Sequence, residues 1–245
     1  MTDRLLDRQS RLLAYLTSGA AIFGDALDAF PNLAAPGVDP ALLRLEASFC
    51  YEKRMAKIAV IFPRTIELLG SERDMIMREF AERCQSKDIA RLANARQFHR
   101  FLLHRQGRDA FKVPYLLDVA ACELAYAQVR TSAEHSDSDY GSDHIGPCRC
   151  IRRSPSVVLL RCAYDVRPVF EEGAAEVAKA ERDMRLVVAM PPGAKHPVVL
   201  EVPVGIFDLL GALDNWVDQA AFSRTPEAES FIGELHKLGL VEVRG

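Results

Sequence analysis

The sequence lacks the features of a membrane-spanning or exported protein. No run of apolar residues approaches the roughly 18 that a transmembrane helix needs. The first residues, MTDRLLDRQSRLLAYL, carry scattered charges and no continuous apolar segment, so we expect no signal peptide. Three of the six cysteines lie within helical patterns. This placement suits reduced, buried thiols, which are typical of cytoplasmic proteins. We therefore expect a cytoplasmic protein with no membrane partner.

The common signatures of catalysis are also missing. The chain has no glycine-rich phosphate loop, no H-E-x-x-H, no G-x-S-x-G and no C-x-x-C motif. His99 and His104 lie five residues apart on a predicted helix and do not share a face as an i, i+4 pair would. We expect no catalytic residues, no metal ligands and no cofactor in this chain, and hence no enzymatic activity of its own.

What the chain does have is an ordinary globular composition with an uneven charge. Its 245 residues are 49% hydrophobic and 27% charged, which suits one large domain or two modest ones. Residues 1–130 carry 19 basic against 16 acidic side chains, whereas residues 156–245 carry 9 against 14. The second half is therefore acidic.

The segment Pro114–Arg130, PYLLDVAACELAYAQVR, organises the first half. It is apolar nearly all round, which is typical of a helix inside a domain. We predict that it is the central helix of an all-α domain covering residues 1–130. Asp118 and Glu123 would then be partly buried, and Arg54 or Arg100 could supply the donors that they need.

Other helical patterns precede this segment, five or six in all with no convincing strand. A first helix begins at Thr2 or Asp3, and Asp39 with Pro40 predicts the start of a long one. The apolar positions of the first helix are Leu5, Leu6, Leu12, Leu13 and Leu16. The expected core positions of the long helix are Leu42, Leu45, Phe49, Ile58 and Phe62.

Residues 131–155 are rich in Ser, Asp and Gly and predict a linker. His135, His144, Cys148 and Cys150 are possible metal or redox residues, but their spacing fits no common zinc site. A redox protein or enzyme that uses Cys148 and Cys150 is the weakest of the alternatives that the sequence leaves open.

The second half changes to a two-residue period. Strands are predicted at 157–166, 184–190 and 196–203, with a short helix at 171–182 after the first of them. Helices follow at 206–217 and from Thr225–Pro226 to a stop at Gly239, and residues 240–243 can form a short strand. The whole chain is thus predicted to be α+β, with a winged-helix-like domain at 156–245 that has a three-stranded antiparallel sheet plus helices.

A winged-helix outline suggests DNA binding, but the charge argues against nucleic acid. The last helix carries Glu227, Glu229 and Glu234 against Lys237, whereas binding a duplex needs cations aimed at phosphates. A sheet edge can instead bind an extended peptide through backbone hydrogen bonds, with side-chain pockets beside it. The predicted docking edge is Val198, Val199, Leu200, Glu201 and Val202. The predicted lining of the adjacent helix is Phe231, Leu235 and Leu238.

Certain segments resemble a known family. RMAKIAVIFPRTIELLG (Arg54–Gly70), the helix around Phe98–Phe101 and Pro114–Val129 are similar to the helical domain of partner proteins of multinuclear non-haem iron oxygenases, a family that has also been labelled DNA-binding. The second half, ending in ELHKLGLVEV (Glu234–Val243), resembles the winged-helix-like element that recognises leader peptides in such pathways. The two-domain layout is similar to the partner protein of the thiaglutamate pathway, although the long linker departs from it.

The resemblance implies a non-catalytic, cytoplasmic accessory subunit in the biosynthesis of a ribosomally made, modified peptide. The subunit would bind the precursor peptide and present it to a barrel-shaped oxygenase, which holds the iron and modifies a peptidyl cysteine. The alternative is a DNA-binding regulator, which the basic excess of residues 1–130 and the family label favour.

Overall fold

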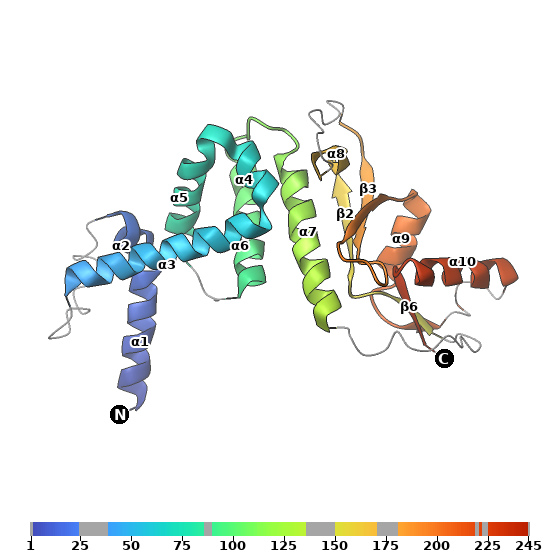
Figure 1. Ribbon diagram of the computed structural model, residues 1–245, viewed down its shortest axis with the longest axis horizontal. Helices are drawn as coiled ribbons and strands as arrows, with labels where there is room; N and C mark the ends of the chain where they lie inside the picture. The colour runs from blue at the N-terminus through green and yellow to red at the C-terminus, as the bar shows by residue number, and fades with distance from the viewer. Residues whose placement is uncertain are drawn as a thin grey trace. The chain divides into compact units, whose positions relative to one another are not determined.

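The computed structural model describes residues 2–24, 39–85, 90–135, 150–170, 181–218, 221 and 225–244. Helices dominate the N-terminal part and strands appear toward the C-terminus, which confirms the predicted α+β class (Figure 1). The chain divides into two compact units, Met1–Leu117 and Asp118–Gly245. No helix in the described part of the chain is long and apolar enough to cross a membrane.

The first unit is helical where it is described, as predicted. Its helices are α1 (Thr2–Leu16), α2 (Gly19–Phe23), α3 (Pro40–Ile61), α4 (Pro63–Leu69), the 3₁₀ turn η2 (Gly70–Glu72), α5 (Arg73–Arg83) and α6 (Arg91–Gln106). Asp39 caps α3 as expected, because its carboxylate accepts a hydrogen bond of 2.8 Å from the N–H of Ala41.

Aromatic rings form much of the core of the first unit. Phe80 lies 5.1 Å from Phe98 and 5.4 Å from Phe101, and Phe62 lies 5.3 Å from Phe98, as distances between ring centroids. Ile58 and Phe62 are buried, as predicted. The other predicted core positions on α3 are wrong, because the side chains of Leu42, Leu45 and Phe49 are exposed. The apolar side chains of Leu5, Leu6, Leu12 and Leu13 on α1 are exposed as well.

The helix predicted at the centre of the first domain is α7 (Leu116–His135), and it lies almost entirely in the second unit. Its Ala125 and Val129 pack against Val188 of the sheet in that unit. Asp118 accepts hydrogen bonds of 2.9 Å from the backbone N–H groups of Ala163 and Tyr164, rather than from Arg54 or Arg100. The expectation that α7 is buried is therefore confirmed, but its Ala125 and Val129 pack on a sheet.

The second unit contains two three-stranded antiparallel sheets in place of the single sheet that was predicted. One has the order β5-β1-β6 and the other the order β2-β3-β4. The strands are β1 (Cys150–Arg153), β2 (Val157–Cys162), β3 (Met184–Ala189), β4 (Val198–Glu201), β5 (Val217–Asp218) and β6 (Val241–Arg244). The further helices are α8 (Arg167–Phe170), α9 (Val204–Ala212) and α10 (Pro226–Lys237).

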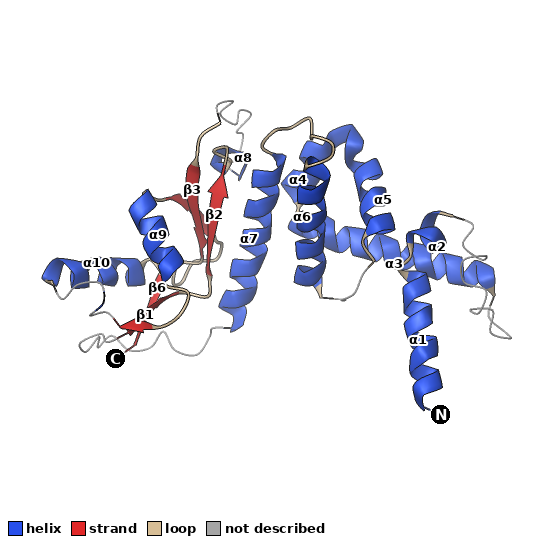
Figure 2. Ribbon diagram, turned by 180° about the vertical axis from the view of Figure 1, so that it is seen from behind, coloured by secondary structure: helices blue, strands red, loops and turns tan. Residues whose placement is uncertain are grey.

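The β2-β3-β4 sheet is covered by helices on both faces (Figure 2). Val188 and Val199 face α7, whereas Val187 and Ala189 belong to the core that α9 and α10 share with the other sheet. Because successive side chains of a strand alternate between faces, one short sheet supplies both cores.

The predicted linker is partly regular structure. α7 continues to His135 and β1 begins at Cys150, so both ends of the expected 131–155 linker belong to elements of the second unit. His144 and Cys148 lie outside the described residues, as does most of the helix expected at 171–182.

Candidate functional site

Strand β4 lies at an edge of its sheet. Among the described strands it pairs with β3 alone, in the register Leu186–Glu201, Val187–Leu200, Val188–Val199 and Ala189–Val198. Four of the five residues predicted as the docking edge therefore form this strand, and Val202 follows it. An edge strand presents unpaired backbone groups that an added strand can use.

One hydrogen bond shows which backbone groups point outward. The N–H of Val202 donates to the carbonyl of Arg185 at 3.0 Å, so these two residues form a hydrogen-bonded pair. In an antiparallel ladder such pairs alternate with pairs whose N–H and C=O groups point away from each other. The backbone groups of Leu200 thus face β3, and those of Val199 and Glu201 face the open edge.

Two prolines limit the length of the open edge. By the same alternation Pro197 and Pro203 belong to the outward set, and neither has an N–H to donate. The carbonyl of Pro203 accepts hydrogen bonds from Ile206 and Phe207 at the start of α9. The edge therefore offers the outward N–H groups of Val199 and Glu201, enough for an added strand of about four residues.

Ion pairs hold the C-terminal end of β4. Glu201 contacts the guanidinium groups of Arg167, at 2.9 Å, and of Arg182. Arg167 also binds Asp165 at 2.6 Å, and its hydrogen bond lowers the pKa of the Asp165 carboxyl. The Glu201 side chain is thus occupied by arginines, and its backbone is the part that an added strand can reach.

The helix predicted to line this edge is not the one beside the sheet. α10 packs chiefly against β6, whereas α9 packs against β2 and β3. Leu235 is a core residue at 4% exposure, while Phe231 and Leu238 are 40% and 48% exposed. The structure thus brings the β4 residues together but assigns Leu235 to the interior of the unit.

Side chains of α9 are closer candidates for the lining. α9 follows β4 after Val202 and Pro203, and its first residue, Val204, is 56% exposed. A side chain built at Gly205 would meet no atom within 4 Å, so there is open space at this turn. The helical pattern at 206–217 was the sequence signal for this helix. Its apolar residues are also typical of ordinary core positions, so they did not identify α9 as the lining of the edge.

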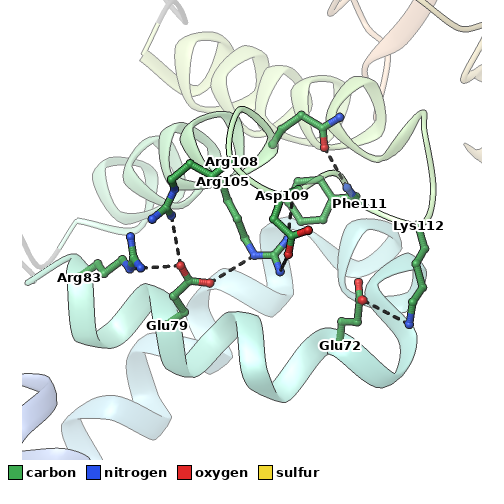
Figure 3. Close-up of polar contacts among 9 residues, drawn as sticks. Glu72, Glu79, Arg83, Arg105, Arg108, Asp109, Phe111 and Lys112 are labelled. Atoms are coloured by element: carbon green, nitrogen blue, oxygen red, sulfur yellow. Dashed lines mark hydrogen bonds and ion pairs between the residues drawn. The ribbon is translucent and has the colours of Figure 1, made fainter.

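A polar cluster of the first unit centres on Glu79 and Arg105 (Figure 3). Glu79 of α5 contacts Arg83 at 3.1 Å and both Arg105 and Arg108 at 3.2 Å. Arg105, 5% exposed, also binds Asp109 and lies over the ring of Phe111. These contacts tie α5 to the end of α6 and the loop that follows, as a buried ion pair commonly does.

Arg54 is a half-buried cation of the first unit. Its guanidinium donates to Asn94 Oδ1 at 3.0 Å, the Cys84 carbonyl at 2.7 Å and Gln97 Oε1 at 2.8 Å. Burial lowers the pKa of Arg54 to about 10. These three partners are neutral groups, so Arg54 joins α3 to the end of α5 and to α6 by charge-assisted hydrogen bonds.

Trp216, the one tryptophan, marks the outer face of the β5-β1-β6 sheet. The guanidinium of Arg152 lies 4.6 Å and that of Arg244 5.8 Å from its ring centroid. Arg152 also binds Glu242 at 2.6 Å across the paired strands. This cluster joins β1, β6 and the segment before β5, and Glu242 neutralises the guanidinium of Arg152.

Within the described residues, no three His, Cys, Asp or Glu side chains come together as metal ligands would. Cys122 and Cys162 are both buried, and the hydrogen bond between their side chains, together with burial, raises the pKa of Cys122. Cys150 lies on β1. A comparison with models of protein families and a search of curated proteins find no match for the chain.

Proposed function

We propose that this chain is a non-catalytic, cytoplasmic accessory subunit that binds the leader of a precursor peptide along β4. It presents that peptide to a multinuclear non-haem iron oxygenase, which modifies a peptidyl cysteine. The iron belongs to the oxygenase, and this chain needs no cofactor. The resemblance of Arg54–Gly70 and Pro114–Val129 to oxygenase partner proteins supplies the identity of the enzyme in this proposal.

The observation that carries the proposal is the open edge of β4. The outward backbone groups of Val199 and Glu201 can pair with a short extended segment, and the sheet behind them is held by α7 and α9. A rigid edge favours binding because the edge itself loses little conformational entropy, and most of the entropy cost comes from ordering the added peptide. An edge of this length binds weakly alone, so contacts of the leader with α9 contribute as well.

The charge of the second half supports a peptide over a duplex. The exposed residues of α10 include Glu227 and Glu229, whereas Lys237 is paired with Glu234 at 2.9 Å. A leader peptide with basic residues beside its extended segment would be attracted by this acidic surface.

Proline substitutions at two sheet edges provide the test. Val199→Pro removes one outward N–H of β4 and leaves the bonds to β3 intact, so we expect the affinity for the precursor peptide to fall about tenfold. The measurement is isothermal titration calorimetry of the full chain with the precursor peptide encoded beside it, with and without the oxygenase.

Arg161→Pro is the matched control, because alternation along β3 turns the N–H of Arg161 toward the opposite edge of the same sheet. We expect this variant to bind the peptide as the wild type does. Equal loss in both variants, or no binding by the wild-type chain in either condition, contradicts the proposal. Binding of duplex DNA that weakens steeply with salt would favour a DNA-binding regulator instead.

A further inference from the structure

The N-terminal helix α1 has a leucine face that its own unit leaves exposed. Leu5, Leu6, Leu12 and Leu13 are 60%, 64%, 38% and 54% exposed. Each pair, Leu5 with Leu12 and Leu6 with Leu13, is seven residues apart, so the four side chains share one side of the helix. The buried Tyr15, in the last turn of α1, anchors the helix to Ala21 and Ala47.

The first half of α3 has a matching apolar stripe. Leu42, Leu45 and Phe49, at positions i, i+3 and i+7, are 63%, 50% and 45% exposed. Such spacing is that of a helix seam that packs against another helix. Ala47, on the other side of α3, is the position that the last turn of α1 already uses within the unit.

The charges beside the two faces are opposite. Arg8 lies one turn from both Leu5 and Leu12 and is exposed. On α3, the exposed Glu46 lies one turn from Leu42 and from Phe49, and Glu52 lies one turn after Phe49, with Lys53 next to it. The leucine face therefore has a basic flank, and the α3 stripe has a mainly acidic one.

The combined area is that of a dimer interface. Seven large apolar side chains at these exposures present on the order of 700 Å² per copy, and a standard protein interface buries about 800 Å² per partner. Neither face alone reaches this area. A two-fold symmetric pair in which each copy contributes both faces would bury both at once.

We propose that the chain forms a homodimer in which the leucine face of α1 in one copy packs on the α3 stripe of the other. The two contacts are identical by symmetry, and each places Arg8 beside Glu46 of the other copy. The dimer is independent of peptide binding, because both faces belong to the first unit and β4 to the second.

Sedimentation equilibrium of the full chain over a range of concentrations tests the dimer. We expect Leu5→Ser with Leu12→Ser to weaken dimerisation at least about 30-fold, and Leu42→Ser with Leu45→Ser to do the same from the opposite face. Leu103→Ser is the matched control, since Leu103 on α6 is 46% exposed but lies outside both faces. Circular dichroism verifies that each variant keeps its helix content.

A charge reversal tests the pairing of α1 with α3. Arg8→Glu and Glu46→Arg should each weaken the dimer about threefold, and the chain carrying both should regain wild-type affinity, less so at high salt. A wild-type chain that stays monomeric at every concentration overturns the proposal, even if these faces bind a different protein. Leucine variants that dimerise like Leu103→Ser, or a double charge variant without recovery, also overturn it.

Discussion

The carboxylate of Asp118, in the first turn of α7, accepts a hydrogen bond of 2.9 Å from the backbone N–H of Tyr164. The same oxygen accepts a second bond of 2.9 Å from the N–H of Ala163, just after β2 ends. Burial raises the pKa of the Asp118 carboxyl, and these two backbone hydrogen bonds oppose that shift. One side chain thus joins the start of a helix to a strand that comes about forty residues later in the chain.

Replacing Asp118 should loosen this junction. We expect Asp118→Ala to lower the free energy of unfolding by about 2–3 kcal/mol, because two half-buried N–H groups lose their acceptor. Asp118→Asn retains one carbonyl oxygen and should cost about 1 kcal/mol. Urea denaturation measures both, and Asp208→Ala on the exposed side of α9 is the control. Equal free energies of unfolding for all three variants would show that the junction contributes nothing to stability.

Arg105 should matter more to stability than other arginines of the first unit. Arg105→Ala leaves Glu79 without its least exposed partner and removes the cation from over Phe111, so we expect a loss of about 3 kcal/mol. Arg73→Ala breaks an exposed pair with Asp74 and should cost no more than about 0.5 kcal/mol. A loss for Arg105→Ala as small as for Arg73→Ala would show that the cluster is incidental. Chemical denaturation provides the values.

His99 should make the protein less stable in acid. Its Nε2 is buried with no hydrogen-bond partner in the structure, and burial lowers its pKa below the ordinary value of 6.5. The imidazole of His99 therefore binds a proton more tightly in the unfolded chain than in the folded one. The free energy of unfolding then falls as the pH drops from about 7 through the ordinary pKa of histidine. His99→Gln should flatten that slope, measured by denaturation at several pH values, whereas the exposed His196→Gln should not. An unchanged slope in His99→Gln would contradict the prediction.

Gly239 and Gly233 should respond to alanine with opposite signs. Gly239, between α10 and β6, has a φ of +71°, and an added Cβ would lie 2.9 Å from Cδ of Pro192. Gly239→Ala should therefore destabilise the protein by about 2 kcal/mol. Gly233 lies inside α10 with open space beside it, so Gly233→Ala should stabilise by about 0.5–1 kcal/mol. Thermal unfolding compares the two, and a shift of the same sign in both would be inconsistent with this account.

Local signals in the sequence determined the elements of this protein. Asp39 and Thr225 cap α3 and α10 as predicted, with hydrogen bonds of 2.8 Å and 3.3 Å to N–H groups two and three residues ahead. The two-residue period predicted β2, β3 and β4 near their observed positions. Such signals are readable because a cap or an alternation depends on neighbours in the chain.

Packing partners were decided by the tertiary structure alone. The apolar surface of α7 predicted burial, but an apolar side chain carries no information on whether it meets a helix or a sheet. The spacing of Leu42, Leu45 and Phe49 likewise predicted core positions, but the fold of the unit leaves these three side chains exposed. β1 was missed because four residues without alternation become a strand only when β6, about ninety residues later, pairs with them.

The sequence predicted one part of the candidate site, and the tertiary structure decided the rest. The sequence was sufficient to select Val198–Val202 as a strand with prolines at its ends. Only the fold decided that this strand is an edge, that Val199 and Glu201 turn their backbone groups outward, and that α9 rather than α10 lies on the sheet. Which strand lies at an edge, and which of its backbone groups point outward, depend on how the strands pair. That pairing is set by contacts between residues far apart in the chain.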